Sequence, residues 1–264
     1  MKNHLVTLAV AMALAPAAAF AETPEEIGLR IAQEADARET GYGDTEVVMR
    51  MVLRNRQGEE SVRNFRTKSL EVLDDGDKSM SIFDEPRDVK GTALLTFTHK
   101  TDSDDQWLYL PALKRVKRIS SENRSGSFVG SEFAYEDLSS QEVEKYTYKF
   151  IADEPCPGAE DLTCWKIERY PTDENSGYTR QVSWSDHDEY RAWKIDFYDR
   201  KDAHLKTLVF ADYRQYLGQF WRAHSLNMVN HQTGKSTDLR VDDFSFQTGL
   251  KDRDFNQKAL SRAR

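Results

Sequence analysis

The sequence predicts a mainly β protein, built as a curved antiparallel sheet of about ten or eleven strands. From Thr45 onward, apolar and polar residues alternate with a period of two, as in Val47, Met49, Met51 and Leu53. This alternation is typical of strands with one face on a core and the other in water. No long helical pattern separates the strands, which excludes a parallel α/β architecture. A sheet of this size can bury its apolar face by curving around itself, and such barrels can hold a ligand.

The N-terminus has the features of a secretory signal peptide over residues 1–21. Lys2 precedes an apolar run over residues 5–19, and residues 19–21 (AFA) fit an A-x-A cleavage site. The apolar run is too short for a membrane-spanning helix, and no later run reaches that length. No cysteine stands at the cleavage site. We therefore expect residues 22–264 to form a single exported domain that is released into the periplasm without a lipid anchor.

A helix is predicted over Pro24–Arg38. Thr23 can serve as its N-cap, Pro24 occupies the first helical position, and Glu26 completes a capping box. Ile27 and Ile31 begin a narrow apolar stripe along one side of this helix. A second, short helical turn is predicted within Glu136–Val143. The C-terminal residues 251–264 predict either a short helix or a frayed end.

Strands are predicted wherever the period-two alternation recurs later in the chain. These runs are Ala93–Phe97, Gln106–Leu110, Tyr146–Phe150, Trp165–Ile167, Tyr178–Trp184, Trp193–Phe197 and His224–Met228. The apolar faces of these strands have two interpretations: an ordinary core, or the wall of a cavity. Both use the same faces at different depths.

The two cysteines, Cys156 and Cys164, are expected to form a structural disulfide. They flank a short segment that contains Pro157 and Gly158, in a chain expected to reach an oxidising compartment. Their spacing is not the C-x-x-C of redox catalysts.

Composition and motifs argue against several functions. The formal net charge is −8 and the pI is near 5.4, so the chain lacks the positive field that nucleic-acid binding needs. The same acidity favours only transient contact with anionic membranes. No metal-ligand spacing, H-E-x-x-H motif or G-x-S-x-G elbow is present. We expect neither a cofactor nor a metal, and we do not expect an enzyme.

A basic cluster, Lys114–Arg118, also has two interpretations. It can be an edge strand whose charges prevent pairing with other chains. It can instead contact a lipid headgroup or an acidic partner, because arginine binds phosphate and carboxylate well. Alternation places Arg115 and Lys117 on the same face, and these two are the candidate contact residues.

The phrases GTALLTF, WLYLPALKRVKRIS and SGSFVGSEFAYEDL within Gly91–Leu138 resemble the LolA-like family of outer membrane lipoprotein-sorting proteins. The resemblance implies a half-open antiparallel β-barrel with a helical lid over an apolar cavity, as in LolA and LolB. Pro24–Arg38 would be that lid. It also implies a carrier for a lipid or for lipoprotein acyl chains, and many family members accompany exporters of the resistance–nodulation–division (RND) superfamily. The alternative is an interaction module that docks on such an exporter without carrying cargo.

Under the carrier interpretation, apolar and aromatic side chains of the strands and of the segment after them would line the cavity. The candidates are Met49, Met51, Phe97, Trp107, Tyr109, Phe128, Phe133, Trp184 and Trp193. Met49 and Met51 suit an adaptable wall, since thioether chains fit irregular apolar shapes.

Overall fold

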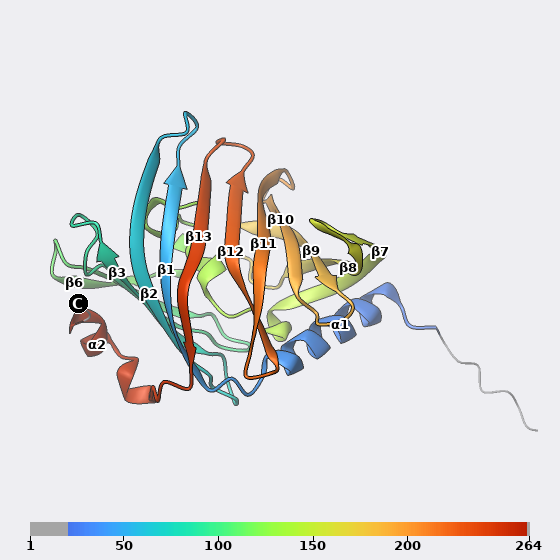
Figure 1. Ribbon diagram of the computed structural model, residues 1–264, viewed down its shortest axis with the longest axis horizontal. Coiled ribbons are helices and arrows are strands. Elements are labelled where there is room, and N and C mark those ends of the chain that lie inside the picture. The colour runs from blue at the N-terminus through green and yellow to red at the C-terminus, as the bar shows by residue number, and fades with distance from the viewer. Residues whose placement is uncertain (1–20, 263–264) are drawn as a thin grey trace, which may run out of the picture.

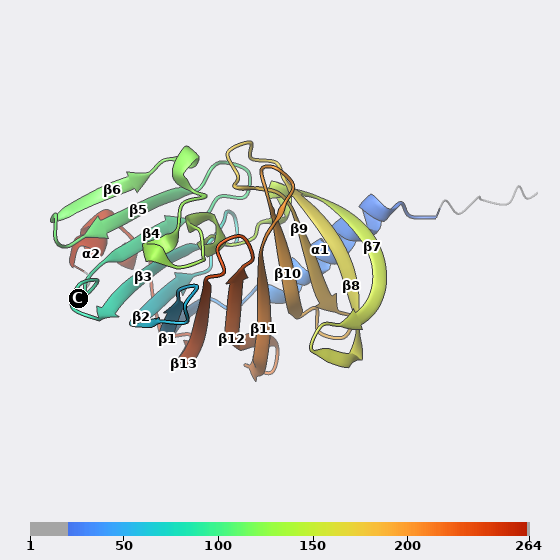
Figure 2. The same ribbon diagram turned by 90° about the horizontal axis from the view of Figure 1, so that it is seen from above.

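The computed structural model describes residues 21–262, which form one strongly curved, unclosed antiparallel sheet (Figures 1 and 2). Its strand order is β6-β5-β4-β3-β2-β1-β13-β12-β11-β10-β9-β8-β7. Strands that follow one another in the sequence are neighbours in the sheet, apart from β6 and β7, and β1 pairs with β13 in the middle. The two edges, β6 and β7, are joined in sequence by residues 120–145, which we call the inner segment. The predicted fold class is confirmed.

The strands are β1 (Asp44–Arg54), β2 (Glu60–Leu70), β3 (Lys78–Glu85), β4 (Ala93–Phe97), β5 (Asp105–Leu110), β6 (Arg115–Ile119), β7 (Tyr146–Cys156), β8 (Ala159–Pro171), β9 (Tyr178–Asp186), β10 (Ala192–Asp199), β11 (His204–Tyr216), β12 (Phe220–Asn230) and β13 (Ser236–Phe246). These 13 strands of the described residues exceed the ten or eleven predicted. One reason is β2, whose sequence ESVRNFRTKSL is mostly polar on both faces.

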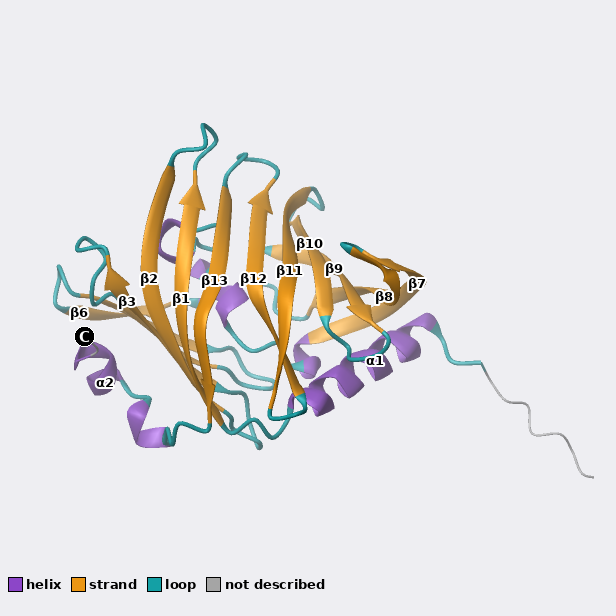
Figure 3. Cartoon of the chain, in the orientation of Figure 1, coloured by secondary structure: helices purple, strands orange, loops and turns teal. Residues whose placement is uncertain are grey.

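The helices are α1 (Pro24–Glu39), α2 (Gln257–Arg262) and the 3₁₀ turns η1 (Ser121–Asn123), η2 (Phe128–Gly130), η3 (Tyr135–Leu138), η4 (Val143–Lys145) and η5 (Asp252–Asp254) (Figure 3). The first helix therefore forms where its capping box predicted it. The expected turn within Glu136–Val143 is split between η3 and η4. Within residues 21–262, no helix is long and apolar enough to cross a membrane. Residues 1–20, most of the expected signal peptide, lie outside the described residues.

The main core lies inside the curve of the sheet. Its buried residues are Met51, Phe65, Phe83, Leu94, Leu108, Phe128, Phe133, Tyr178, Ile195, Phe197, Leu208, Met228 and Leu239. These residues come from the inner segment and from both halves of the strand order, β1–β5 and β9–β13, so the curved sheet encloses them. Phe128 of the inner segment packs on Phe83 of β3, with ring centroids 5.5 Å apart. The inner segment thus fills much of the concave face (Figure 2).

Two further clusters lie on the outer face. Along β3, Met80 and Ile82 alternate with Phe83 and point away from the main core, where they pack with Phe255 and Leu260 near the C-terminus. Leu260 belongs to α2, so the C-terminal segment forms the short helix that was one of its two predicted states (Figure 1). The second outer cluster surrounds the Cys156–Cys164 disulfide, which is confirmed, with the two Cα atoms 5.0 Å apart.

Strand β10 departs from the simple alternation that its sequence predicted. Trp193, Ile195 and Phe197 were expected on one face. Ile195 and Phe197 lie in the main core, but Trp193 packs against the outer cluster near the disulfide. The pairing of β10 with β9 shifts register near both ends of β10. A bulge of this kind turns the following side chains to the other face. On β9, likewise, Tyr178 lies in the main core and Trp184 in the outer cluster.

Candidate functional site

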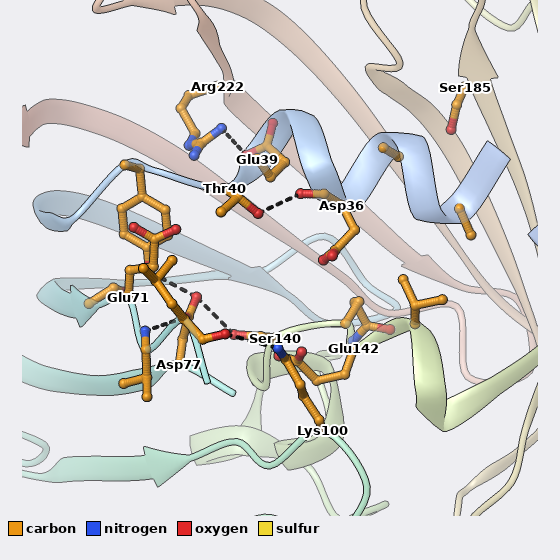
Figure 4. A pocket seen from close by; sticks show the side chains of 18 of the residues that line it. Asp36, Glu39, Thr40, Glu71, Asp77, Lys100, Ser140, Glu142, Ser185 and Arg222 are labelled. Carbon is orange, nitrogen blue, oxygen red and sulfur yellow. Dashed lines mark hydrogen bonds and ion pairs between the residues drawn. The ribbon is translucent and has the colours of Figure 1, made fainter. Parts of the chain in front are cut away.

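A cavity of about 550 Å³ lies between α1 and the inner face of the sheet, at the end that the inner segment leaves open (Figure 4). Its wall is formed by α1, by β1 and β2 on one side, by β7, β8 and β9 on the other, and by residues 140–143 of the inner segment. Elements from the two halves of the strand order therefore meet at this cavity. Its volume lies within the range typical of small-molecule sites, about 300–1,000 Å³.

Helix α1 is fixed in place by its start and by one close contact. Glu26 N donates to Thr23 Oγ1 at 3.2 Å and Thr23 N donates to Glu26 Oε2 at 2.8 Å, which completes the capping box. A Cβ on Gly28 would lie 2.9 Å from the backbone nitrogens of Lys149 and Phe150. Only glycine therefore lets α1 approach edge strand β7 this closely.

The apolar part of the cavity wall comes mainly from buried side chains. Ile31 of α1 packs with Tyr148 of β7 and Ile167 of β8. Val47 of β1 and Phe244 of β13 continue the apolar surface toward the middle of the sheet. An alkyl chain could lie along this surface and leave water.

The polar part of the wall is strongly acidic. Six carboxylate side chains line the cavity, against three cationic ones. The carboxylates are Asp36, Glu39, Glu71, Asp75, Asp77 and Glu142, and the cations are Lys100, Arg169 and Arg222. The cavity is therefore a region of negative potential beside an apolar wall.

Several of these charges are already matched. Arg222 pairs with Glu39 at 2.5 Å, and Arg169 Nε donates to Gln181 Oε1 at 2.8 Å. Lys100 Nζ donates to the carbonyl oxygen of Leu73 at 3.0 Å.

Two other carboxylates are held by hydrogen bonds. Glu71 accepts from the backbone N–H groups of Gly41 and Gly43, at 2.5 and 2.8 Å. Asp75 Oδ2 lies 2.7 Å from His99 Nδ1, and this hydrogen bond lowers the pKa of Asp75 to about 2. These two groups serve the local structure.

Within residues 21–262, Asp36, Asp77 and Glu142 make no ion pair. Asp77 accepts from Tyr42 Oη at 2.8 Å and from Val72 N at 3.1 Å, and burial raises its pKa. Asp36 lies at the exposed rim, on α1, and partial burial together with the charge of Glu144 raises its pKa.

Glu142 has the largest shift in pKa of the three. Its residue is 9% exposed, and within residues 21–262 its carboxylate makes no hydrogen bond or ion pair. Burial, followed by the charges of Asp77 and Asp36, raises its pKa to about 7. Among residues 21–262 no group of three or more His, Cys, Asp or Glu side chains is arranged to hold a metal ion.

The nine predicted cavity residues lie elsewhere, and the structure does not bring them together. Met51, Phe128 and Phe133 are in the main core, and Met49 packs against it. Phe97, Trp107 and Tyr109 are on the outer face under α2, and Trp184 and Trp193 are in the outer cluster near the disulfide. Phe97 and Trp107 line a smaller cavity of about 220 Å³ beside Phe255.

Arg115 and Lys117 lie on β6, an edge strand of the sheet. Both side chains are exposed, and in the part of the chain that the structure describes neither makes an ion pair. Their neighbour Arg118 is paired with Asp105 on β5. The two predicted contact residues are thus free to meet a partner, far from the acidic cavity in the strand order.

Sequence reasoning did not find Asp36, Asp77 or Glu142. The chain holds 45 Asp and Glu residues, so a carboxylate alone carries little information. The one local signal was the run EDLSSQEV, which predicted a helical turn at the point where Glu142 stands.

Comparison with known proteins identifies relatives over most of the chain. A family model described as "Uncharacterized protein" matches residues 75–262. A solved structure from Vibrio parahaemolyticus, described as an outer membrane lipoprotein-sorting protein domain, is 58% identical and has a TM-score of 0.87; the match covers 90% of this chain and 100% of that one. A DUF1329 family protein from Desulfovibrio piger is 30% identical, with a TM-score of 0.84 and the same coverage of both chains.

A LolA superfamily protein from Nitrosomonas europaea is 19% identical with a TM-score of 0.70, again over 90% of this chain and 100% of that one, and shows that the fold is shared. Comparison with curated protein sequences gives no match. A half-open β-barrel with an N-terminal helix beside its cavity defines the class of lipoprotein carrier-like folds. The chain belongs to the LolA-like family of outer membrane lipoprotein-sorting proteins.

Proposed function

We propose that this protein is a carrier that binds a hydrophobic ligand, a lipid or the acyl chains of a lipoprotein, and transfers it between sites in the cell envelope. The main observation behind this proposal is the cavity beneath α1, with an apolar wall of Ile31, Val47, Tyr148 and Ile167. The name of the relative from Vibrio parahaemolyticus, a lipoprotein-sorting protein domain, supports the same class of ligand. Binding rather than catalysis is the proposed activity.

The driving force would be reversible burial of alkyl chains. Each CH₂ group that leaves water for an apolar wall contributes about 0.8 kcal/mol. A chain of moderate length therefore binds firmly enough to be carried, and weakly enough for a membrane or a receptor to take it back.

Helix α1 would act as the lid. Its C-terminal end is held by polar contacts, Arg38 Nη1 to the carbonyl oxygen of Asp188 at 3.0 Å and the Glu39–Arg222 ion pair. Contacts of this kind at a surface contribute little to stability. The end of α1 beside the cavity can therefore separate while the Gly28 contact keeps the helix on β7.

We place this activity in the periplasm. Residues 1–21 would act as a cleavable signal peptide, and residues 22–264 would function as one domain without a lipid anchor. An RND-superfamily exporter is the proposed membrane partner, with transient membrane contact during transfer.

Native mass spectrometry, together with lipid extraction, tests the carrier proposal on protein purified from the periplasm without detergent. A stoichiometric co-purifying lipid or acylated molecule would establish a carrier and identify its cargo. An apo mass, together with no binding of a fluorescent fatty-acyl probe, would contradict it.

The alternative is a docking module that carries no cargo, and the edge strand β6 favours it. Arg115 and Lys117 are exposed on an edge strand and make no ion pair with residues 21–262, so they offer charge and backbone groups to an acidic partner. The double variant Arg115→Glu/Lys117→Glu should lose crosslinking to the exporter if this strand docks. Arg87→Glu/Lys90→Glu, a matched pair of exposed residues between β3 and β4, serves as control. Unchanged crosslinking in the first variant would contradict docking and would indicate that the basic cluster only protects a solvated edge strand.

A further inference from the structure

Glu142 is a buried carboxyl without a partner inside the described residues, which is uncommon in proteins. Buried polar groups are almost always hydrogen-bonded, and buried charges are almost always paired. The residue is only 9% exposed and lines the cavity (Figure 4), and its carboxylate oxygens open into that cavity without a hydrogen bond or ion pair from residues 21–262. A molecule that enters the cavity can therefore reach a carboxylate whose acceptor positions are not used within the described residues.

The surroundings of Glu142 define the charge of that partner. Asp77 from the β2–β3 connection and Asp36 from α1 both act on it, and Glu144 adds a third negative charge. Two cations act against these charges. Lys145 acts on Glu142, but its Nζ is already paired with Asp104, and Lys100 acts on Asp36, while its Nζ donates to the carbonyl oxygen of Leu73. A cation would relieve this repulsion, and an anion would increase it.

Asp77 can accept a further hydrogen bond. An ionised carboxylate has about four acceptor positions. Tyr42 Oη and Ser140 Oγ use two of them on Oδ2, at 2.8 and 3.5 Å, and Val72 N uses one on Oδ1 at 3.1 Å. Asp77 and Glu142 together thus offer acceptors from two elements to a group with several N–H donors, and a primary ammonium has three.

The apolar wall begins on the same cavity surface. Ile31, Ala32 and Ala35 lie within about one and a half turns of Asp36 along α1, and Val143 follows Glu142 directly. A ligand that contacts the acidic part of the wall therefore also meets aliphatic side chains. The two parts together match a molecule with a cationic end and an alkyl chain.

We propose that this cavity binds a primary ammonium amphiphile, with the ammonium group between Glu142 and Asp77 and the alkyl chain against α1 and the inner face of the sheet. Asp36, at the exposed rim, attracts the cation before it enters. This rests on the proposed carrier function and specifies the headgroup of its cargo.

Calorimetric titration with decylammonium, decanoate and ethylammonium, below their micelle concentrations and in amine-free buffer, tests the proposal. At about pH 8, decylammonium should bind about tenfold more tightly than decanoate, the difference that one charge-assisted hydrogen bond supplies. The preference should shrink toward about pH 5.5, where Glu142 is protonated.

Glu142→Gln should abolish the preference for decylammonium over decanoate. Glu144→Gln removes the same charge two residues away, from an exposed side chain outside the cavity wall, and should retain it. Equal loss in both variants would reduce the effect to net charge and overturn the site.

The remaining outcomes separate this inference from the carrier proposal. Equal binding of decylammonium and decanoate would overturn the ammonium site while leaving a carrier of alkyl chains. Ethylammonium binding as tightly as decylammonium would make the ligand a free amine and not an amphiphile. Binding of neither ten-carbon ligand would overturn both proposals.

Discussion

Lys206 and Asp137 form an ion pair inside the curve of the sheet, with Nζ and Oδ2 2.6 Å apart and side chains 4% and 7% exposed. Lys206 Nζ also donates to the carbonyl oxygen of Glu132 at 2.9 Å, and Tyr178 Oη donates to Asp137 Oδ1 at 2.8 Å. These contacts join the inner segment to β9 and β11. The segment is thereby held on the concave face, next to the cavity beside α1.

Removing one member of this pair should strongly destabilise the fold. Lys206→Met would leave Asp137 buried without its cation, and breaking a buried pair in this way costs about 3–5 kcal/mol. The free energy of unfolding, measured by urea denaturation, checks the value. Arg30→Met is the control, because its ion pair with Glu22 is exposed and its loss should change stability little. Equal losses in the two variants would contradict a buried pair.

Glu142 should make stability depend on pH. Its pKa is raised from the ordinary 4.5 to about 7, so between these values the folded state binds more protons than the unfolded state. Its contribution is therefore complete below about pH 4.5 and is lost as the pH rises through about 7.

Glu142→Gln should accordingly be more stable than the parent at about pH 8, and this advantage should disappear toward about pH 4.5. An upper limit of about 3.5 kcal/mol follows from the rise in pKa from 4.5 to about 7 at about 1.4 kcal/mol per pH unit, and water in the open cavity reduces it. Urea denaturation across this range measures the difference. Glu144→Gln should show no such pH dependence, and a parallel offset at every pH in both variants would argue against the assignment.

Gly28→Ala should loosen α1 from β7. Alanine favours a helix by about 1 kcal/mol over glycine, so propensity alone predicts a more stable protein. The added Cβ, however, would lie 2.9 Å from two backbone nitrogens of β7, and overpacking of this kind costs about 1–3 kcal/mol. Faster hydrogen exchange in α1 and β7 is the expected result. Gln33→Ala, on the exposed side of α1, should leave exchange unchanged.

The disulfide should contribute stability without affecting the cavity. Cys156→Ala/Cys164→Ala opens a short loop, and chain-entropy arguments give a loss of roughly 2–3 kcal/mol. Because the outer cluster around the disulfide does not line the cavity, decylammonium affinity should stay the same. Reductant should destabilise the parent protein by a similar amount and leave the double variant unaffected.

Local signals in the sequence were sufficient to predict several elements of the fold. Helix α1 begins at Pro24 because its capping box, proline and apolar stripe all lie within a few residues of one another. The fold class followed from the alternation of apolar and polar residues, because in each strand by itself this pattern indicates that one face is buried. The disulfide followed from the short separation of its two cysteines.

What the sequence could not predict depends on contacts between distant segments. Trp193 turns to the outer face because of how β10 pairs with β9, and nothing in its own strand signals that register shift. Asp36, Asp77 and Glu142 come from a helix, a strand connection and the inner segment, and the curvature of the sheet brings them together. An aromatic residue on an alternating strand, such as Trp107, fits a core on either face equally well.

The pairing of β1 with β13 has a consequence for how the fold assembles. Residues 44–119 and residues 146–246 each form a run of consecutive hairpins, which can pair locally as soon as they are made. Thr45 and Phe246, partners at the centre of the sheet, are roughly 200 residues apart, and such distant contacts form slowly. The final strand therefore completes the middle of the molecule and not its margin. Until Ser236–Phe246 arrives, the chain consists of two separate hairpin runs with the cavity between them still unformed.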